Sequence, residues 1–368
     1  MKILNNLALS SLLLFSACMN QDIASLKLAD QNASLTTVKL LTRMHELSKQ
    51  GIMFGHQDDL AYGIGWKSPD GQSDVFRVCS DYPAIFGWDL ADIETGSQYN
   101  IDSVPFGEMM KFAIKIHDQG GINTFSWHAN NPLTGGNAWD VNTPGVVKSI
   151  LPGGSKHDEY TMRLDKLAIF FSNLKDANGI CIPVIFRPFH EQTGNWFWWG
   201  KSHCSAEECI TLWKYTFTYL TQTKNIHNLI YAFSTADSFN TTVEFSDRYP
   251  GDAYVDIVGF DIYQQPKQTS EAFAGNLKAK LKILSEFANV NKKLPAITEI
   301  GYEQIPDPGW WTDVFYQSAK DTRLSYALFW RNAANRPNHY YVPYPRQISE
   351  ENFRKFCDLP ETLFLKDI

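Results

Sequence analysis

Eight short apolar runs, each ending in polar residues, alternate with amphipathic stretches along this chain, and the pattern restricts the folds open to it. Each run is nearly continuous in apolar residues, which is typical of strands buried on both faces of a parallel sheet. The runs are GIMFGH (51–56), PAIFGWDL (83–90), GINTFSWHA (121–129), CIPVIFRPFHE (181–191), NLIYAFSTAD (228–237), VDIVGFDIY (255–263), LPAITEIG (294–301) and LSYALFWRN (324–332). Helical periodicity falls between several of them, at 106–119, 158–177, 208–223 and 273–290.

Eight strands alternating with helices predict an α/β fold consisting of a single (β/α)8 TIM barrel. In a doubly wound sheet strands also alternate with helices, but no G-x-G-x-x-G motif follows the first run. The barrel is therefore the preferred fold. In a barrel the carboxyl ends of the strands meet on one face, which holds the active site. The polar residues at the run ends are His56, Asp89, Trp127, His128, His190, Glu191, Asp237, Asp261, Tyr263, Glu299, Trp330 and Arg331.

The amino terminus reads as an export signal rather than as part of the fold. Lys2 precedes an apolar run that is too short to span a bilayer, and small residues then lead to Cys18. Small residues directly before a cysteine resemble a bacterial lipobox, although an ordinary signal peptide with an incidental cysteine is the alternative. We therefore predict a signal peptide over 1–17, lipidation of Cys18, a polar leader over 19–35 and a catalytic domain over 36–368, held at a bacterial membrane on the periplasmic or outer side.

The remaining five cysteines are an odd number, so they cannot all pair with one another. Cys204 and Cys209 are close enough to form a small loop, but spacing alone does not establish a bond. No C-x-x-C spacing of a zinc or redox site occurs, and we interpret these cysteines as structural.

Composition and motifs exclude several classes of function. A net charge of −7, a pI near 5.7 and the lack of a Lys/Arg cluster argue against nucleic acid as a partner. G-x-S-x-G and P-loop patterns are absent, and HEQTG lacks the second histidine of H-E-x-x-H, which would stand at Gly194. A metal site built from His56, His128 and His190 on three strand ends is left open by spacing. We nevertheless expect no metal or organic cofactor, and a monomer.

Two glutamates at strand ends fit glycoside hydrolysis, which needs one protonated and one ionised carboxyl group. Glu191 ends the fourth run and is followed by Trp196, Trp198 and Trp199, and apolar surroundings raise the pKa of a carboxyl group. Glu299 ends the seventh run, where we expect it to face Arg187 and Tyr263 and to stay ionised. Glu191 is therefore the predicted acid/base and Glu299 the predicted nucleophile, at the retaining separation of about 5–5.5 Å.

An aromatic content of 14% suits a ring-lined groove, because pyranose rings stack their C–H faces on flat side chains. Five tryptophans lie at or just beyond the predicted strand ends: Trp127, Trp196, Trp198, Trp199 and Trp330. Trp198 and Trp199 are adjacent, so one or both are expected in the wall of the groove. Trp310 and Trp311 are expected to pack in the core.

The motifs RPFHE, TEIG, GFDIY, LFWRN and GHQ together resemble glycoside hydrolase family 26 over about residues 38 to 365. The best known members of this family are β-1,4-mannanases whose catalytic glutamates lie on strands four and seven. The resemblance implies the same roles for Glu191 and Glu299. It also implies that His190 orients the site, that Trp196 lines the cleft near the leaving-group sugar and that Tyr263 hydrogen-bonds the nucleophile.

Four further roles are implied by the resemblance. Trp330 would form the floor beneath the sugar being cleaved, and Arg331 would grip the next sugar on the non-reducing side. His128 would reach a hydroxyl near the cleavage point, and Asp261 would give polar support. The expected partner is therefore β-mannan or a manno-oligosaccharide.

The Gly- and Pro-rich segment 130–158 bears on how such an enzyme cuts. A long segment there can close one end of the cleft, so that mannobiose is released from chain ends, or it can leave the cleft open, so that the chain is cleaved internally; we favour release from chain ends.

Two alternative functions remain: a related barrel glycosidase acting on glucan, xylan or mixed-linkage β-glucan, and a sugar-binding lipoprotein without turnover. Alanine in place of either glutamate separates enzyme from binder.

Overall fold

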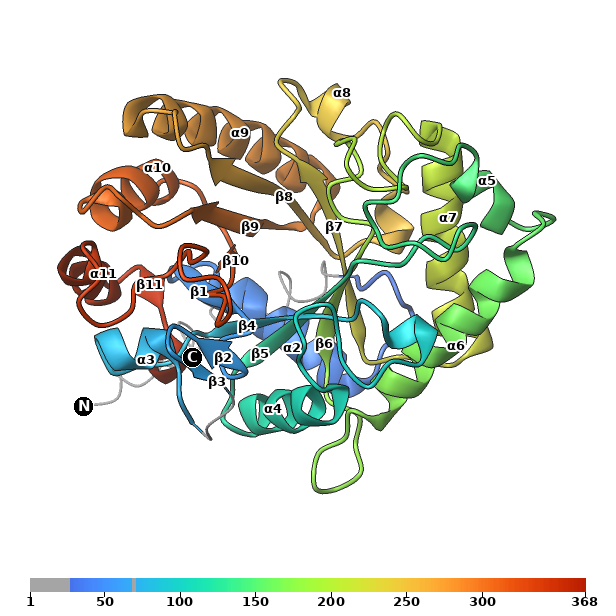
Figure 1. The fold of residues 1–368 in the computed structure, drawn as a ribbon, viewed down its shortest axis with the longest axis horizontal. Helices are drawn as coiled ribbons and strands as arrows, with labels where there is room; N and C mark the ends of the chain where they lie inside the picture. The colour runs from blue at the N-terminus through green and yellow to red at the C-terminus, as the bar shows by residue number, and fades with distance from the viewer. Residues whose placement is uncertain (1–26, 68–70) are drawn as a thin grey trace, which may run out of the picture.

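A computed structural model describes residues 27–67 and 71–368. Eight parallel strands pair in chain order, and β10 pairs with β1 to close a barrel, which confirms the predicted TIM barrel (Figure 1). Each of the eight predicted runs overlaps a barrel strand, and β1, β8 and β9 continue one residue beyond their runs. The strands are β1 (Ile52–Gln57), β4 (Ile85–Asp89), β5 (Ile122–Trp127), β6 (Val184–Pro188), β7 (Leu229–Ala236), β8 (Ile257–Gln264), β9 (Leu294–Tyr302) and β10 (Tyr326–Phe329).

Helices surround this barrel, and the four helical stretches predicted from periodicity are all present. The α-helices are α2 (Leu35–Leu47), α3 (Asp74–Cys79), α4 (Phe106–Asp118), α5 (Val146–Ile150), α6 (His157–Asn173), α7 (Ala206–Thr218), α8 (Thr242–Phe245), α9 (Ser270–Asn291), α10 (Gln317–Ala319) and α11 (Glu350–Cys357). Short 3-10 and π-helical turns are η1 (Ile93–Thr95), η2 (Tyr219–Thr223), η3 (Asp252–Tyr254), η4 (Trp310–Tyr316) and η5 (Leu365–Asp367). None of the helices within residues 27–67 and 71–368 is long and apolar enough to cross a membrane.

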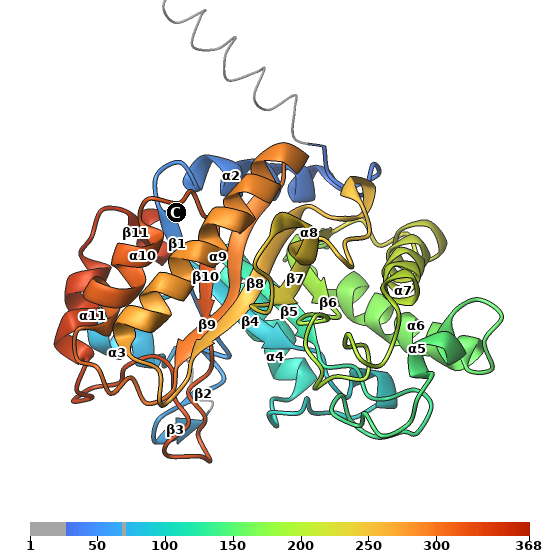
Figure 2. The same ribbon diagram turned by 90° about the horizontal axis from the view of Figure 1, so that it is seen from above.

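Three two-residue strands were not predicted, because so short a segment has no periodicity. The strands β2 (Tyr62–Gly63) and β3 (Trp66–Lys67) form a hairpin beyond the carboxyl end of β1, and β11 (Thr362–Leu363) pairs with the start of β1. Figure 2 shows this hairpin at one end of the barrel and α2 at the other.

The helix α2 closes the amino-terminal end of the barrel. Ser34 caps it by accepting a hydrogen bond from the backbone nitrogen of Thr37. Its buried face carries Leu40, Met44 and Leu47, at the spacing of one helical side, and these side chains share a cluster with residues inside the barrel. Burying a side chain of this size stabilises the fold by about 1.5–3 kcal/mol.

The chain just before α2 also packs on this end of the barrel. The backbone nitrogen of Ala29 donates to Asp256 (2.6 Å), and Asp30 pairs with His227 (2.7 Å). The folded structure thus already includes Leu28, although 19–35 was assigned to the leader. The predicted signal peptide, Cys18 and residues 19–26 of the leader lie outside the described residues.

No disulfide joins cysteines of the described part of the chain: Cys79, Cys181, Cys204, Cys209 and Cys357 are free thiols. Cys204 and Cys209 are buried, in agreement with a structural role.

Candidate active site

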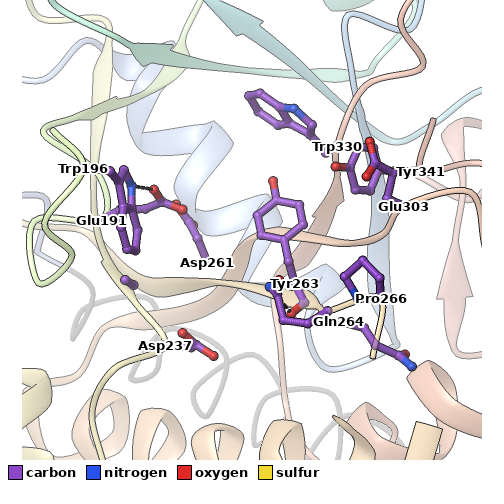
Figure 3. A pocket seen from close by; sticks show the side chains of 12 residues that line it. Glu191, Trp196, Asp237, Asp261, Tyr263, Gln264, Pro266, Glu303, Trp330 and Tyr341 are labelled. Carbon is purple, nitrogen blue, oxygen red and sulfur yellow. Dashed lines mark hydrogen bonds between the residues drawn. The ribbon is translucent and has the colours of Figure 1, made fainter. Parts of the chain in front are cut away.

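Polar and aromatic side chains from several strand ends line one cleft at the carboxyl end of the barrel (Figure 3). Its volume is about 430 Å³. The lining residues are Glu191, Trp196, Ala236, Asp237, Asp261, Tyr263, Gln264, Gln265, Pro266, Glu303, Trp330 and Tyr341. The expected convergence of strand ends is therefore present, and it includes the predicted acid and the predicted sugar floor.

The backbone after β6 makes an unusual turn that presents Glu191 to the cleft. Phe189 and Glu191 both adopt left-handed conformations, with φ of 49° and 54°. For non-glycine residues this costs on the order of 1–3 kcal/mol, and such strain clusters at functional sites. The turn is held because Glu191 donates its backbone N–H to Ser234 (3.0 Å) and His190 accepts from the indole of Trp199 (2.8 Å).

Glu191 lies in surroundings that favour its protonated form. Burial raises its pKa well above the usual range, and the nearby charges of Asp261 and Glu299 raise it further. The Trp196 indole donates a 2.5 Å hydrogen bond to Oε2, which opposes the rise. This carboxyl group is therefore equipped to carry a proton.

Glu299, in β9, has different surroundings. Its Oε1 accepts from the Arg187 guanidinium, and its Oε2 accepts from the Tyr263 hydroxyl (2.8 Å), as expected. Burial alone would lower the pKa of Arg187, but the charges of Asp261 and Glu299 raise it, so the guanidinium stays charged. Both oxygens of Glu299 thus accept a hydrogen bond from a fixed donor, which holds the carboxyl group in one orientation.

Asp261 occupies the other side of Arg187 and gives the predicted polar support. It accepts from Arg187 (2.8 Å), Ser234 (2.9 Å) and Thr298 (2.6 Å) and is fully buried. One carboxylate oxygen each of Glu191, Asp261 and Glu299 lies within 4.8 Å of the other two. This separation is close to that of retaining glycosidases and well below the roughly 6.5–9.5 Å that leaves room for an attacking water in inverting ones.

Among the described residues, His56, His128 and His190 do not come together in one group with metal-ligand geometry. Within the described ranges, Glu191, Asp261 and Glu299 are the only group of three or more side chains with metal-ligand geometry. His56 instead pairs with Asp59 (2.6 Å) in the interior. His128 and His190 contact each other, as described below.

The tryptophans fall into two groups: rings that are exposed in or beside the cleft, and buried rings that support its wall. Trp196 is 44% exposed, and the half-buried Trp330 lines the same cleft. Trp127, Trp198 and Trp199 are fully buried, and their indoles donate to Glu94, Ala129 and His190 respectively, so they are walls. Trp310 and Trp311 are fully buried, as expected for packing.

Trp139 was missed by the sequence analysis. It is 44% exposed, stacks on the His128 ring at 5.1 Å and comes from segment 130–158. Its ring is thus exposed beside His128, but a single tryptophan inside a Gly-rich loop gave no positional signal.

Arg331 is held in place by two residues that were also missed. Its guanidinium pairs with Asp102 (2.9 Å) and donates to the Tyr62 hydroxyl (3.3 Å), which itself donates to Asp58 (2.5 Å). Tyr62 belongs to the two-residue strand β2 beyond β1, and Asp102 lies in the loop between η1 and α4; neither segment has a periodic pattern that places a side chain. The guanidinium is thereby fixed in direction, as a residue that binds a sugar hydroxyl requires.

Comparison with known proteins agrees with this geometry. The sequence matches Glycosyl hydrolase family 26 over residues 29–324. Mannan endo-1,4-β-mannosidases of Bifidobacterium adolescentis and Bacillus subtilis are 34% and 33% identical to it over 75% and 50% of this chain. The chain spans 28% and 51% of the length of these two relatives.

Solved structures agree over nearly the whole chain. A GH26 β-mannanase from Bacteroides ovatus is 42% identical, with a TM-score of 0.88 and coverage of 91% of this chain and 96% of that one. The catalytic domain of a Bacillus sp. JAMB-750 GH26 endo-β-1,4-mannanase is 34% identical, with a TM-score of 0.86 and coverage of 93% and 94%.

Proposed function

Because the chain belongs to glycosyl hydrolase family 26, we propose that it hydrolyses the β-1,4 bonds of mannan or manno-oligosaccharides with retention of configuration. The observation that carries the proposal is the pair Glu191 and Glu299. One carboxylate oxygen of each lies within 4.8 Å of the other; the surroundings of Glu191 favour its protonated form, and both oxygens of Glu299 accept from the fixed donors Arg187 and Tyr263.

In the first step the Glu299 carboxylate attacks the anomeric carbon, and Glu191 gives its proton to the departing glycosidic oxygen. The carbon–oxygen bond to the leaving sugar breaks as the bond to Glu299 forms. Arg187 and Tyr263 hold the two oxygens of Glu299, so the nucleophile meets the sugar in one orientation.

The same geometry changes the role of Glu191 between the two steps. The negative charge of Glu299 raises the pKa of Glu191 in the free enzyme. Once Glu299 is esterified that charge is gone, the pKa of Glu191 falls, and Glu191 becomes the base. It then takes a proton from water, whose oxygen bonds to the anomeric carbon and releases Glu299.

The surrounding side chains support a chain of hexoses as substrate. Trp330 offers a floor beside the carboxylates, Trp196 and Trp139 offer exposed rings, and Arg331 offers a fixed cation. His190 adjoins Glu191 and orients the site. The relatives named mannan endo-1,4-β-mannosidase support mannan over other β-glycans.

We also propose that the protein is exported and anchored through a lipid on Cys18. The support is the lipobox-like sequence alone, in which small residues directly precede that cysteine. Metabolic labelling with a tagged fatty acid, compared between the wild type and Cys18→Ala, tests it.

The time course of products from mannohexaose, cellohexaose and xylohexaose tests the activity. Turnover of the mannose chain alone is expected. Early mannobiose as the dominant product indicates release from chain ends, whereas a spread of product lengths indicates internal cleavage.

The two glutamates are tested by substitution. Glu191→Ala and Glu299→Ala should each lose turnover while calorimetry still detects binding of mannohexaose. Turnover by either variant at the wild-type rate would contradict the assignment.

A further inference from the structure

Asp89, at the carboxyl end of β4, is a buried carboxylate that the two-glutamate mechanism does not use. Its Oδ2 lies 2.5 Å from His128 Nδ1 and accepts from the Ser126 hydroxyl (2.7 Å). Its Oδ1 accepts from the backbone nitrogen of Ala91 (2.7 Å). Burial alone would raise the pKa of Asp89, but His128 and the other donors lower it to about 2. An ionised Asp89 can only accept, so Nδ1 of His128 carries a proton.

The other nitrogen of His128 contacts a second histidine. His128 Nε2 lies 3.1 Å from His190 Nε2, and the two rings meet edge to face at 4.4 Å. Two imidazole nitrogens at this distance need one proton between them. Burial, Arg187 and His128 all lower the pKa of His190, so His190 is neutral. Burial lowers the pKa of His128 too, but Asp89 and Glu299 raise it above its usual range.

The proton on His128 therefore decides which nitrogen of His190 carries a hydrogen. When His128 is doubly protonated, His190 accepts at Nε2 and carries its hydrogen on Nδ1. When His128 has lost the Nε2 proton, the arrangement reverses. Phe197 packs against both rings at 5.1–5.2 Å, which prevents them from separating easily. His190 directly precedes Glu191 and lies between the two left-handed residues of the strained turn, so the position of its ring is coupled through the backbone to that of Glu191.

We propose that Asp89 is a positioning residue for the reaction: by holding the Nδ1 proton of His128, it fixes the orientation of His128 and, through the Nε2–Nε2 contact, that of His190, the residue before Glu191. The inference rests on the proposed function of Glu191 and Glu299. It adds a three-residue array, Asp89–His128–His190, at the carboxyl ends of strands β4, β5 and β6.

The first test is Asp89→Asn, which keeps the size of the side chain but replaces one acceptor oxygen by a donor. We expect kcat on mannohexaose to fall about 10- to 100-fold, by analogy with groups that orient a functional histidine, and KM to change less than about threefold. A rise in KM without a fall in kcat would overturn the proposal.

A double-mutant cycle separates positioning from a general structural effect. If Asp89 acts through His128, then Asp89→Asn combined with His128→Ala loses no more activity than His128→Ala alone. Fold losses that multiply would overturn the proposal. The matched control is Asn123→Ala in β5, which removes buried hydrogen bonds to Trp88 and Ala113; its effect should multiply with that of His128→Ala.

A spectroscopic measurement tests the hydrogen bond itself, independently of activity. In wild-type protein labelled with ¹⁵N-histidine, His128 should give a strongly downfield, slowly exchanging imidazole N–H that correlates with a protonated Nδ1. His56 beside Asp59 and His227 beside Asp30 can give similar signals, so the signal of His128 is the one that is absent from His128→Ala. If no such signal is found, Asp89 does not hold the proton. A wild-type protein that shows the signal but turns over no glycan would instead contradict the proposed function.

Discussion

The hydrogen bond from the Trp196 indole to Glu191 predicts the direction in which a conservative substitution moves the pH profile. This donor favours the ionised form of Glu191 and so lowers its pKa, against burial, which raises it. Trp196→Phe keeps an aromatic ring but removes the N–H. The pKa of Glu191 should therefore rise further. Since the general acid must be protonated to act, activity is lost as pH rises through this pKa, and the basic limb should move to higher pH.

The size of the effect follows from the strength and exposure of the bond. Hydrogen bonds to a charged group contribute about 1.5–3 kcal/mol, and 1.36 kcal/mol corresponds to one pH unit. Because Trp196 is 44% exposed, we take the lower end and expect the limb to move up by about one pH unit.

The assay is kcat/KM on mannohexaose across the pH range, which reports groups of the free enzyme. Trp198→Phe is the matched control, because it removes an indole bond to the Ala129 carbonyl and no bond to a titrating group. Its basic limb should stay in place. If Trp196→Phe leaves the limb unmoved or shifts it to lower pH, the reasoning about Glu191 is wrong.

Three further substitutions test the packing around the site. Arg187→Met leaves two buried carboxylates without their cation and should lower the free energy of unfolding by about 3–5 kcal/mol in urea titrations, together with loss of turnover. Phe54→Ala empties a buried site between stacked rings and should cost about 3–5 kcal/mol in the same assay, with little change in KM. Gly301→Ala places a methyl group 2.2 Å from the Tyr341 ring, which packs on Tyr263, and should lower kcat by at least about tenfold on mannohexaose.

The barrel could be predicted because its strands are buried on both faces and so read as continuous apolar runs. The run 181–191 shows the limit of that signal. Its apolar pattern continues to Phe189, but β6 ends at Pro188 because Phe189 and Glu191 adopt left-handed backbone conformations. The residue types do not predict such a turn, because glycine is the residue usually found at positions with a positive φ.

The site could be predicted only where side chains sit at strand ends, whose positions the barrel fixes. Glu191, Glu299 and Tyr263 belong to this group. Tyr62 comes from the two-residue strand β2 and Asp102 from a loop, and their contact with Arg331 depends on packing that no local pattern specifies. For tryptophans the sequence gives the location but not the exposure, because neighbouring rings such as Trp198 and Trp196 differ only in which way they point.

The entry of the chain at the α2 end of the barrel has a consequence for how a large substrate would reach the enzyme. The described chain begins on the side of the barrel opposite the β2–β3 hairpin (Figure 2), and the cleft lies at the carboxyl ends of the strands, away from that beginning. A lipid on Cys18 would leave about nine residues before Leu28, a tether of at most roughly 30 Å. The bilayer would then lie on the side of the barrel that α2 closes, and the cleft would open toward the surrounding medium, where a polysaccharide can enter it without approaching the membrane.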